Sequence, residues 1–183
     1  MEERCFMHRH DLLKKMNEYK EQTELAQNFV DFIEKYDDCF ERSNTYGHIT
    51  ASCWLVDGSG SKVLLTHHRK LNMWLQPGGH CDGESDVLAV ALKEAQEETG
   101  IQSWKFLDKK IFDIDCHEIP SHKNDPPHYH FDVRFVMVCG EDEGYIVSEE
   151  SHDLAWVPLT ELKEYTTEES ILRMAKKWQA LKP

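Results

Sequence analysis

Residues 79–101 read GHCDGESDVLAVALKEAQEETGI, and the fold prediction depends on this stretch. Its first five residues include two glycines, which is typical of an irregular loop. Further on, small or apolar residues fall on one stripe at helical spacing, namely Leu88, Ala91, Leu92, Ala95 and Thr99. Gly100 is a common residue at the end of a helix. The stretch therefore predicts a glycine loop joined directly to a helix.

Three glutamates lie on this predicted helix. Because residues three and four apart are neighbours on an α-helix, Glu94, Glu97 and Glu98 share an arc of about 100°. We expect this arc to lie opposite much of the apolar stripe. An acidic run is most often a solvated face. Here it follows a glycine loop, whose backbone can approach an ion or a phosphate closely. Mg2+ prefers carboxylate oxygens, so the combination predicts a cation site.

The same stretch resembles the Nudix box of the Nudix hydrolase superfamily, which includes MutT-like proteins. The box is written G-x5-E-x7-R-E-U-x-E-E-x-G-U, where U is aliphatic. The matching residues are Gly79, Glu94, Glu97, Glu98, Gly100 and Ile101. Ser85 stands where the box has its first glutamate, and Lys93 replaces its arginine. Glu84, one residue earlier, is a candidate substitute for that glutamate. Lysine supplies the charge of the arginine but not its bidentate fork.

The resemblance implies a reaction and a set of site residues. It implies hydrolysis of a phosphoanhydride bond in a nucleoside diphosphate linked to another moiety, with Mg2+ as cofactor and Mn2+ as an alternative. Glu94, Glu97 and Glu98 are the implied catalytic residues, and either Glu94 or Glu98 helps to deprotonate the attacking water. The implied metal ligands are Gly78, Glu94, Glu97, Glu98 and a late-loop carboxylate, for which Glu150 is preferred over Glu149.

Apolar periodicity predicts the remaining elements. Helices are expected within residues 11–40 and at 160–165 and 168–181, and strands at 45–56, 62–68, 106–115, 129–139 and 154–157. The turn sequence at residues 57–60 joins the first two strands into a hairpin. Because strands and helices interleave, the class is α+β. With the resemblance, this predicts a Nudix-type α/β/α sandwich with a mixed β-sheet at residues 44–183, preceded by an N-terminal helical extension at residues 1–43.

Candidate substrate-binding residues lie outside the helix. His68 and Arg69 belong to one of the few basic groups in the chain and are predicted to contact phosphate, although an ordinary exposed strand end is an equal alternative. His80 follows the glycine pair and is predicted to contact the metal-bound phosphate, with fixing the loop as the alternative.

A second group of histidines surrounds the polar loop at residues 120–127. It comprises His117, His122, His128 and His130. In a strand, His128, His130 and Asp132 would share one face. Such imidazole and carboxylate sets bind transition metals, but histidines near a phosphate pocket also donate hydrogen bonds to substrate. Substrate contact or a plain surface role is preferred to a second metal site, and His128 and His130 are predicted to bind substrate.

Composition limits the partners. The 183-residue chain has 21 Lys and Arg against 34 Asp and Glu, so its formal charge of -13 opposes a broad grip on a nucleic-acid backbone. The expected partner is a small phosphate-containing molecule. No apolar run reaches the roughly 20 residues needed to cross a bilayer, and the six scattered cysteines form no CxxC pair. We therefore expect a cytoplasmic protein without a membrane partner. The N-terminal helices are candidates for a homodimer contact or a cap over the pocket.

Two other functions fit the same fold. One is a non-catalytic nucleotide sensor, and the other is an isoprenoid-diphosphate isomerase. The complete set of Glu94, Glu97 and Glu98 favours the hydrolase over both. The substrate itself is not predicted, because specificity pockets are built from strands and loops without a sequence pattern of their own.

Overall fold

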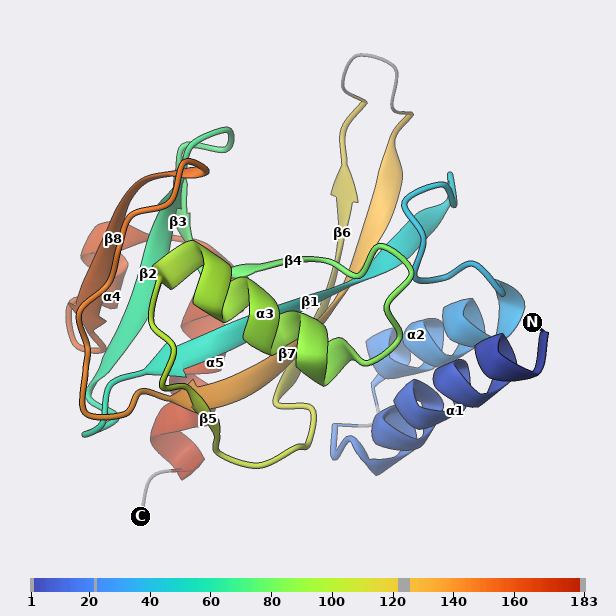
Figure 1. Ribbon diagram of the computed structural model, residues 1–183, viewed down its shortest axis with the longest axis horizontal. Helices are drawn as coiled ribbons and strands as arrows, with labels where there is room; N and C mark the ends of the chain where they lie inside the picture. Colours follow the sequence, from blue (N-terminus) through green and yellow to red (C-terminus); the bar gives the residue numbers. More distant parts are fainter. Residues whose placement is uncertain (1, 22, 122–125, 182–183) are drawn as a thin grey trace. The chain divides into compact units, whose positions relative to one another are not determined.

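The computed structural model describes residues 2–21, 23–121 and 126–181, and for residues 2–8 the backbone alone (Figure 1). These residues form five helices and eight strands, so the class is α+β as predicted. The chain divides into two compact units. The first comprises Met1–Ala51, Gly79–Ala91 and Lys109–Phe135, and the second comprises Ser52–Gly78, Leu92–Asp108 and Val136–Pro183. The loop at 120–127 and His122 lie partly or wholly outside the described residues.

Two helices open the first unit. Helices α1 (Glu2–Glu18) and α2 (Glu24–Lys35) lie side by side, where the sequence predicts helices within residues 11–40 (Figure 1). The Thr23 hydroxyl caps α2 by accepting a hydrogen bond from the Ala26 amide at 3.3 Å. On the buried side of α2, Phe32 stacks on Phe131 with ring centroids 4.0 Å apart. Aromatic packing therefore attaches α2 to strand β7 (His128–Val138).

The strands between residues 105 and 119 correct one prediction. A single strand was expected at residues 106–115, but β5 (Lys105–Phe106) ends early and β6 (Asp113–Ile119) begins only at Asp113. Between them, residues 108–110 are three consecutive charged residues and all are exposed. Because they do not alternate between two faces, they cannot continue a half-buried strand. β6 then pairs antiparallel with β7, from Asp113 opposite Arg134 to Ile119 opposite His128.

The strands are neighbours in a sheet. Along its path the order is β3 (Met73–Leu75), β2 (Lys62–His68), β1 (Gly47–Val56), β7 and β5, and β8 (Ser151–Pro158) pairs antiparallel with β2. The predicted hairpin of β1 and β2 is confirmed by their antiparallel pairing.

Two helices complete the second unit, α4 (Leu162–Tyr165) and α5 (Glu169–Leu181). Helix α5 buries Ile171, Met174, Ala175 and Trp178, and the Trp178 indole donates a hydrogen bond to the Gly60 carbonyl at 2.9 Å. All five tryptophans of the chain belong to this unit, namely Trp54, Trp74, Trp104, Trp156 and Trp178.

The turn between β1 and β2 is organised by Asp57, whose side chain is buried. Its carboxylate accepts hydrogen bonds from the Lys62 amide at 2.8 Å and from the Ser59 hydroxyl at 2.5 Å. Burial by itself raises the pKa of Asp57, but the hydrogen bonds from Ser59 and from backbone amides outweigh it, so the pKa lies below its ordinary value. The ionised carboxylate therefore stabilises the turn.

We expect Asp57→Asn to lower the free energy of unfolding by about 1–2 kcal/mol at pH 7, because an amide replaces a hydrogen-bonded buried carboxylate. A pKa depressed by folding gives stability that is present above the unfolded value of about 3.9 and is lost as pH falls through the folded value. The difference between the two proteins should therefore shrink below about pH 4. Urea unfolding at pH 7 and at pH 3 measures it. Asp153→Asn, at an exposed aspartate of β8, is the control, and an equal effect of both variants would contradict the prediction.

Candidate functional site

The predicted loop and helix are both present. Asp86 begins helix α3 (Val87–Thr99) by accepting hydrogen bonds from the amides of Leu88 and Ala89 at 3.1 and 3.2 Å. In the loop before it, Gly83 has φ +85°, and a Cβ there would lie 2.5 Å from Glu41 Oε1, so the turn requires glycine. The Glu84 carboxylate accepts a hydrogen bond from the Asp86 amide at 2.9 Å. Its role as a substitute for the box glutamate stays a prediction.

The three glutamates of α3 differ in exposure. Glu98 is buried at 8% exposure, and the side chains of Glu94 and Glu97 are 18% and 60% exposed. The expectation that all three lie away from the apolar stripe is therefore wrong for Glu98. The reason is helical spacing, because Glu98 is three residues beyond the fully buried Ala95 and shares its side of the helix.

A backbone amide orients the Glu98 carboxylate. The Gly78 N–H, at the start of β4 (Gly78–His80), donates a hydrogen bond to Glu98 Oε1 at 2.8 Å. The segment before Gly78 is itself held by the Cys53 amide, which donates to the Pro77 carbonyl at 2.9 Å. Sequence reasoning gave this segment as an irregular loop and missed the short strand. This hydrogen bond joins the glycine segment to the glutamates of α3, so both contribute to the same candidate site.

Negative charge accumulates around Glu98. Burial raises the pKa of Glu98 to about 8, and the charges of Glu94 and Glu150 act in the same direction against the opposing Gly78 hydrogen bond. Glu150 was predicted from the resemblance alone, and its electrostatic effect on Glu98 places it near the helix glutamates. The charges of Glu94 and Glu150 thus act on Glu98 within the second unit.

Lys93 is the basic residue nearest to these glutamates on the helix. Its Nζ lies 3.6 Å from Glu97 Oε2 and 4.0 Å from Glu94 Oε1. The side chain is 64% exposed, so each ion pair contributes less than about 1 kcal/mol. Lys93 therefore lies within ion-pair distance of two of the three glutamates.

His68 and Arg69, the predicted phosphate-binding residues at the end of β2, form hydrogen bonds with other parts of the protein. A register shift between His67 and His68 interrupts the pairing of β2 with β8, as is common beside functional sites. Beyond it, the Arg69 amide donates to the Glu150 carbonyl at 2.9 Å, and its guanidinium donates to the Ser151 carbonyl at 2.8 Å. His68 Nδ1 accepts a hydrogen bond from the Leu71 amide at 3.2 Å. Burial lowers the pKa of His68, although the Glu150 charge opposes this. Arg69 therefore positions the backbone around Glu150.

The other predicted substrate-binding residues lie in the first unit. The His130 ring is 4.8 Å from that of His80 and 5.2 Å from that of His128, measured between centroids. His48, in β1, joins them at 4.7 Å from His130. Sequence reasoning missed His48, since nothing in the spacing connects it with histidines so far along the chain. The alternative partner Asp132 is engaged elsewhere, accepting hydrogen bonds from Thr50 Oγ1 and Arg134 Nε at 3.0 and 2.7 Å.

The carboxylate group suits a hard divalent cation. Glu94, Glu98 and Glu150 supply oxygen donors, and burial together with the charges of Glu94 and Glu150 raises the pKa of Glu98. A cation bound there would neutralise this charge. The residues predicted to hold Mg2+ are therefore suited to it by donor type and by charge.

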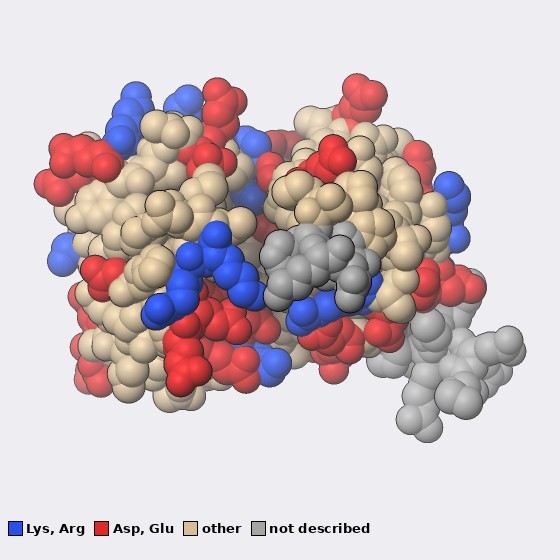
Figure 2. All heavy atoms as spheres, turned by 90° about the horizontal axis from the view of Figure 1, so that it is seen from above, with Lys and Arg blue, Asp and Glu red and all other residues tan. Residues whose placement is uncertain are grey.

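The molecular surface carries more acidic than basic side chains. On the face drawn in Figure 2, Asp and Glu are spread widely, and Lys and Arg occur in small groups. In the described part of the chain, no helix combines the length and the apolar character that a membrane span requires. The surface in view therefore offers no broad basic region for a polyanion.

Comparisons with known proteins identify the family. The model of the family described as "NUDIX domain" matches residues 46–178. The Xenopus laevis protein "m7GpppN-mRNA hydrolase NUDT17" is 40% identical over 62 residues, which cover 29% of this chain and 21% of that protein. The Lactococcus lactis subsp. cremoris protein "Probable DHNTP pyrophosphohydrolase" is 31% identical over 84 residues, which cover 45% of this chain and 49% of that protein. The chain thus spans less than half the length of these relatives.

The fold is shared with solved structures. The structure of the E. coli dihydroneopterin triphosphate pyrophosphohydrolase superposes with a TM-score of 0.60 at 14% sequence identity, covering 73% of this chain and 97% of that one. At this identity the likeness shows the fold, which is the predicted α+β arrangement of helices and a mixed sheet. The family match covers well over half of the chain and includes Glu94, Glu97 and Glu98. The chain therefore belongs to the NUDIX domain family.

Proposed function

We propose that the chain is a Mg2+-dependent hydrolase that cleaves a phosphoanhydride bond in a nucleoside diphosphate linked to another moiety. The observation that carries the proposal is the buried Glu98 carboxylate, oriented by the Gly78 amide and subject to the charges of Glu94 and Glu150. Membership of the NUDIX domain family supports it. The relatives named as a DHNTP pyrophosphohydrolase and an m7GpppN-mRNA hydrolase lend further support.

The proposed metal ligands are Gly78, Glu94, Glu97, Glu98 and Glu150, with Mg2+ preferred and Mn2+ as an alternative. When bound, such an ion neutralises the diphosphate charge and lowers the pKa of a water molecule that attacks phosphorus. The backbone carbonyl of Gly78 is its proposed ligand atom, and the amide of the same residue orients Glu98.

Other roles in the proposed reaction, namely proton transfer and positioning of the metal ligands, are assigned to side chains and backbone groups of the protein. Of the two glutamates that the resemblance implies for proton transfer, Glu94 and Glu98, we assign the proton-accepting role to Glu98, because the Gly78 amide orients its carboxylate. The Arg69 amide fixes the backbone at Glu150. Lys93 restrains Glu97 and Glu94 by charge. Preformed positions of this kind favour catalysis, because the groups need not reorganise when the substrate binds.

The substrate side of the proposal rests on fewer contacts. His68 and Arg69 remain the proposed phosphate-binding residues of the second unit, and His80 that of the first. His128 and His130 were predicted to bind substrate as well, but their surroundings favour the different role argued below. A domain boundary after residue 43, a cytoplasmic location and a homodimer stay predictions.

An activity screen tests the proposed function. The panel contains nucleoside triphosphates, nucleotide sugars, dinucleoside polyphosphates, ADP-ribose, NADH and dihydroneopterin triphosphate, each assayed with Mg2+ or Mn2+ and with excess EDTA. We expect at least one compound to release phosphate, pyrophosphate or a nucleoside monophosphate with the cation only. Reaction in oxygen-18 water should place the label on one phosphate product, because hydrolysis forms a new P–O bond from water.

The same screen identifies failure. Tight binding of a panel compound without turnover under either cation would contradict the hydrolase and favour the nucleotide sensor. Turnover that persists unchanged in excess EDTA would contradict the metal dependence.

A further inference from the structure

The first residues of β1 and β7 lie unusually close together. The Tyr129 amide donates a hydrogen bond to the Tyr46 carbonyl at 2.9 Å. A Cβ added at Gly47 would lie 2.5 Å from the Tyr129 carbonyl oxygen, so only glycine permits this approach. The residue after Gly47 is His48, and Tyr129 is flanked by His128 and His130. The close backbone contact therefore brings three histidines from distant parts of the sequence together.

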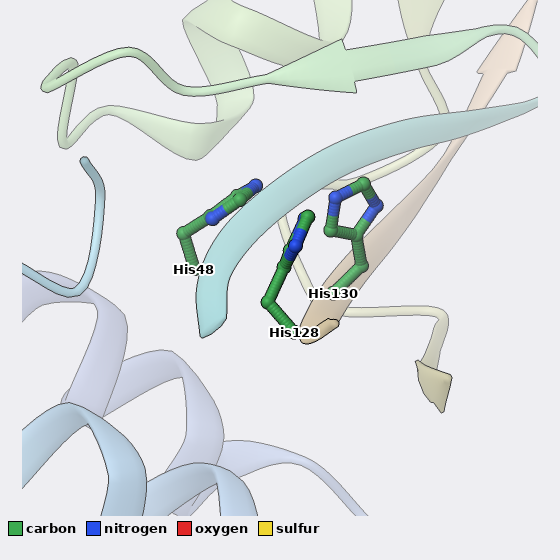
Figure 3. A group of neighbouring side chains, drawn as sticks. All are labelled: His48, His128 and His130. Atoms are coloured by element: carbon green, nitrogen blue, oxygen red, sulfur yellow. The ribbon is translucent and has the colours of Figure 1, made fainter. Parts of the chain in front are cut away.

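The three imidazoles form a compact group. Figure 3 shows His48 at the beginning of β1 and His128 and His130 on β7, with the three rings side by side. The ring centroid of His48 lies 5.0 Å from that of His128 and 4.7 Å from that of His130. One nitrogen from each ring can be chosen so that all three lie within 4.8 Å of one another. Each ring thus offers one potential ligand atom to a common point.

Several of these nitrogens are buried without a hydrogen bond. Both ring nitrogens of His48 and the Nε2 of His130 have no partner among the described residues, and His48 is only 3% exposed. A buried polar atom that lacks a partner costs about 1–3 kcal/mol. A histidine that serves only to fill the core normally has its ring nitrogens hydrogen-bonded. Three such atoms in one group therefore point to a ligand.

The protonation states suit a metal. Burial lowers the pKa of His48 to about 4 and that of His130 to about 2, and the neighbouring His80 acts in the same direction on both. Both imidazoles are therefore neutral at pH 7, as metal ligation requires. His128 Nδ1 lies 2.9 Å from the Pro126 carbonyl oxygen. Since a carbonyl only accepts, Nδ1 carries the hydrogen and Nε2 keeps its lone pair.

A phosphate contact explains the group less well. Anions are bound by cationic or hydrogen-donating groups, whereas three ring nitrogens within 4.8 Å of one another can share a single cation. The carboxylate that could have completed a mixed site, Asp132, is occupied by Thr50 and Arg134. The neighbouring His117 lies 3.3 Å from Asp115 and is 46% exposed. The buried His48 and the half-buried His128 and His130 therefore form a group of imidazoles without a carboxylate ligand among them.

We propose that His48, His128 and His130 bind a borderline transition-metal ion, Zn2+ being the expected one, through one imidazole nitrogen each. With Zn–N bonds of about 2.0–2.1 Å, tetrahedral ligand nitrogens are about 3.3 Å apart, so the rings must close in by about 1.5 Å at most. Water can take the fourth position. This nitrogen site differs in chemistry from the oxygen site proposed for Mg2+, and it does not depend on the proposed hydrolase activity.

Metal content tests the proposal directly. The full chain is stripped with a chelator, incubated with ZnCl2, passed through gel filtration and analysed by mass spectrometry for bound zinc. We expect one equivalent of Zn2+ in the wild type and less than about a tenth of that in His48→Asn and in His130→Asn. His152→Asn is the matched control, because His152 and His67 form a separate pair with ring centroids 5.3 Å apart. Zinc retention by the His48 and His130 variants equal to that of the wild type would overturn the proposal.

A second variant keeps the proposal testable if the asparagine variants fail to fold. His128→Cys replaces one ligand by another that zinc accepts. With Co2+ as the probe, this variant should retain one equivalent and gain a thiolate-to-cobalt charge-transfer band that the wild type lacks. A folded His128→Cys protein without that band would overturn the proposal.

The two proposed metal sites can be separated by one further variant. Glu98→Gln should retain one equivalent of Zn2+, because it changes the carboxylate group alone. Loss of zinc from Glu98→Gln would assign the bound ion to the glutamates and overturn the histidine site.

Discussion

Glu98→Gln should lower Mg2+-dependent turnover by about 10²- to 10⁴-fold without unfolding the protein. Glutamine keeps the size of glutamate, and its Oε1 can still accept the 2.8 Å hydrogen bond from the Gly78 amide. It carries no negative charge for a cation, and it cannot take a proton. The variant therefore separates the charge of Glu98 from its packing at a position that is only 8% exposed.

Initial rates at saturating Mg2+, on a substrate found in the screen, measure the effect. Circular dichroism and the midpoint of urea unfolding verify that the fold is retained. Glu164→Gln, at an exposed glutamate of α4, makes the same chemical change away from the carboxylate group and should keep nearly wild-type rates. A Glu98→Gln protein with normal turnover would remove Glu98 from the proposed catalytic residues.

Arg134→Met should lower the free energy of unfolding by about 3–5 kcal/mol. The Arg134 guanidinium is almost fully buried and contacts three aspartates. Its Nε lies 2.7 Å from Asp132 on the same strand, and its Nη1 and Nη2 lie 3.3 Å from Asp113 and 3.4 Å from Asp115 on β6. Methionine roughly preserves the volume of the arginine stem but leaves Asp113 and Asp132 buried without their cation. Unpaired buried charges are strongly unfavourable, so the loss should be large.

Two further variants test this explanation by urea unfolding. Arg42→Met makes the same substitution at an ion pair with Asp82 in which both side chains are more than half exposed, so it should cost less than about 1 kcal/mol. Adding Asp113→Asn and Asp132→Asn to Arg134→Met removes the buried charges and should restore part of the stability. If Arg134→Met were no more harmful than Arg42→Met, the buried charge network would not be what holds these strands together.

The parts of the fold that the sequence predicts are those governed by local pattern. The hairpin of β1 and β2 follows from a turn sequence after a segment rich in β-branched and aromatic residues, and α3 follows from its stripe and the glycine at its end. The strand expected at residues 106–115 is broken instead, because three exposed charges interrupt it. The short strands β3 and β4 were missed, since segments of three residues carry no detectable period.

In the candidate site, too, local sequence pattern predicts some features, whereas others depend on contacts between distant parts of the chain. Helical spacing places Glu94, Glu97 and Glu98 near one another, but it does not reveal how deeply Glu98 is buried, because burial is set by contacts outside the helix. Glu150 came from resemblance, and its effect on the pKa of Glu98 emerges only in three dimensions. His48 was missed for a similar reason. Its neighbours are assembled by the close approach of two strands at Gly47, which a linear pattern does not record.

The placement of the tryptophans allows intrinsic fluorescence to monitor the unfolding of one unit separately. All five belong to the second unit, whereas Arg134 and its aspartates belong to the first. Indole fluorescence therefore follows unfolding of the second unit alone, while far-ultraviolet circular dichroism follows both. Transitions seen by different probes coincide when unfolding is two-state. In the Arg134→Met protein, a loss of dichroism that precedes the fluorescence change would mean that the two units unfold as separate cooperative blocks.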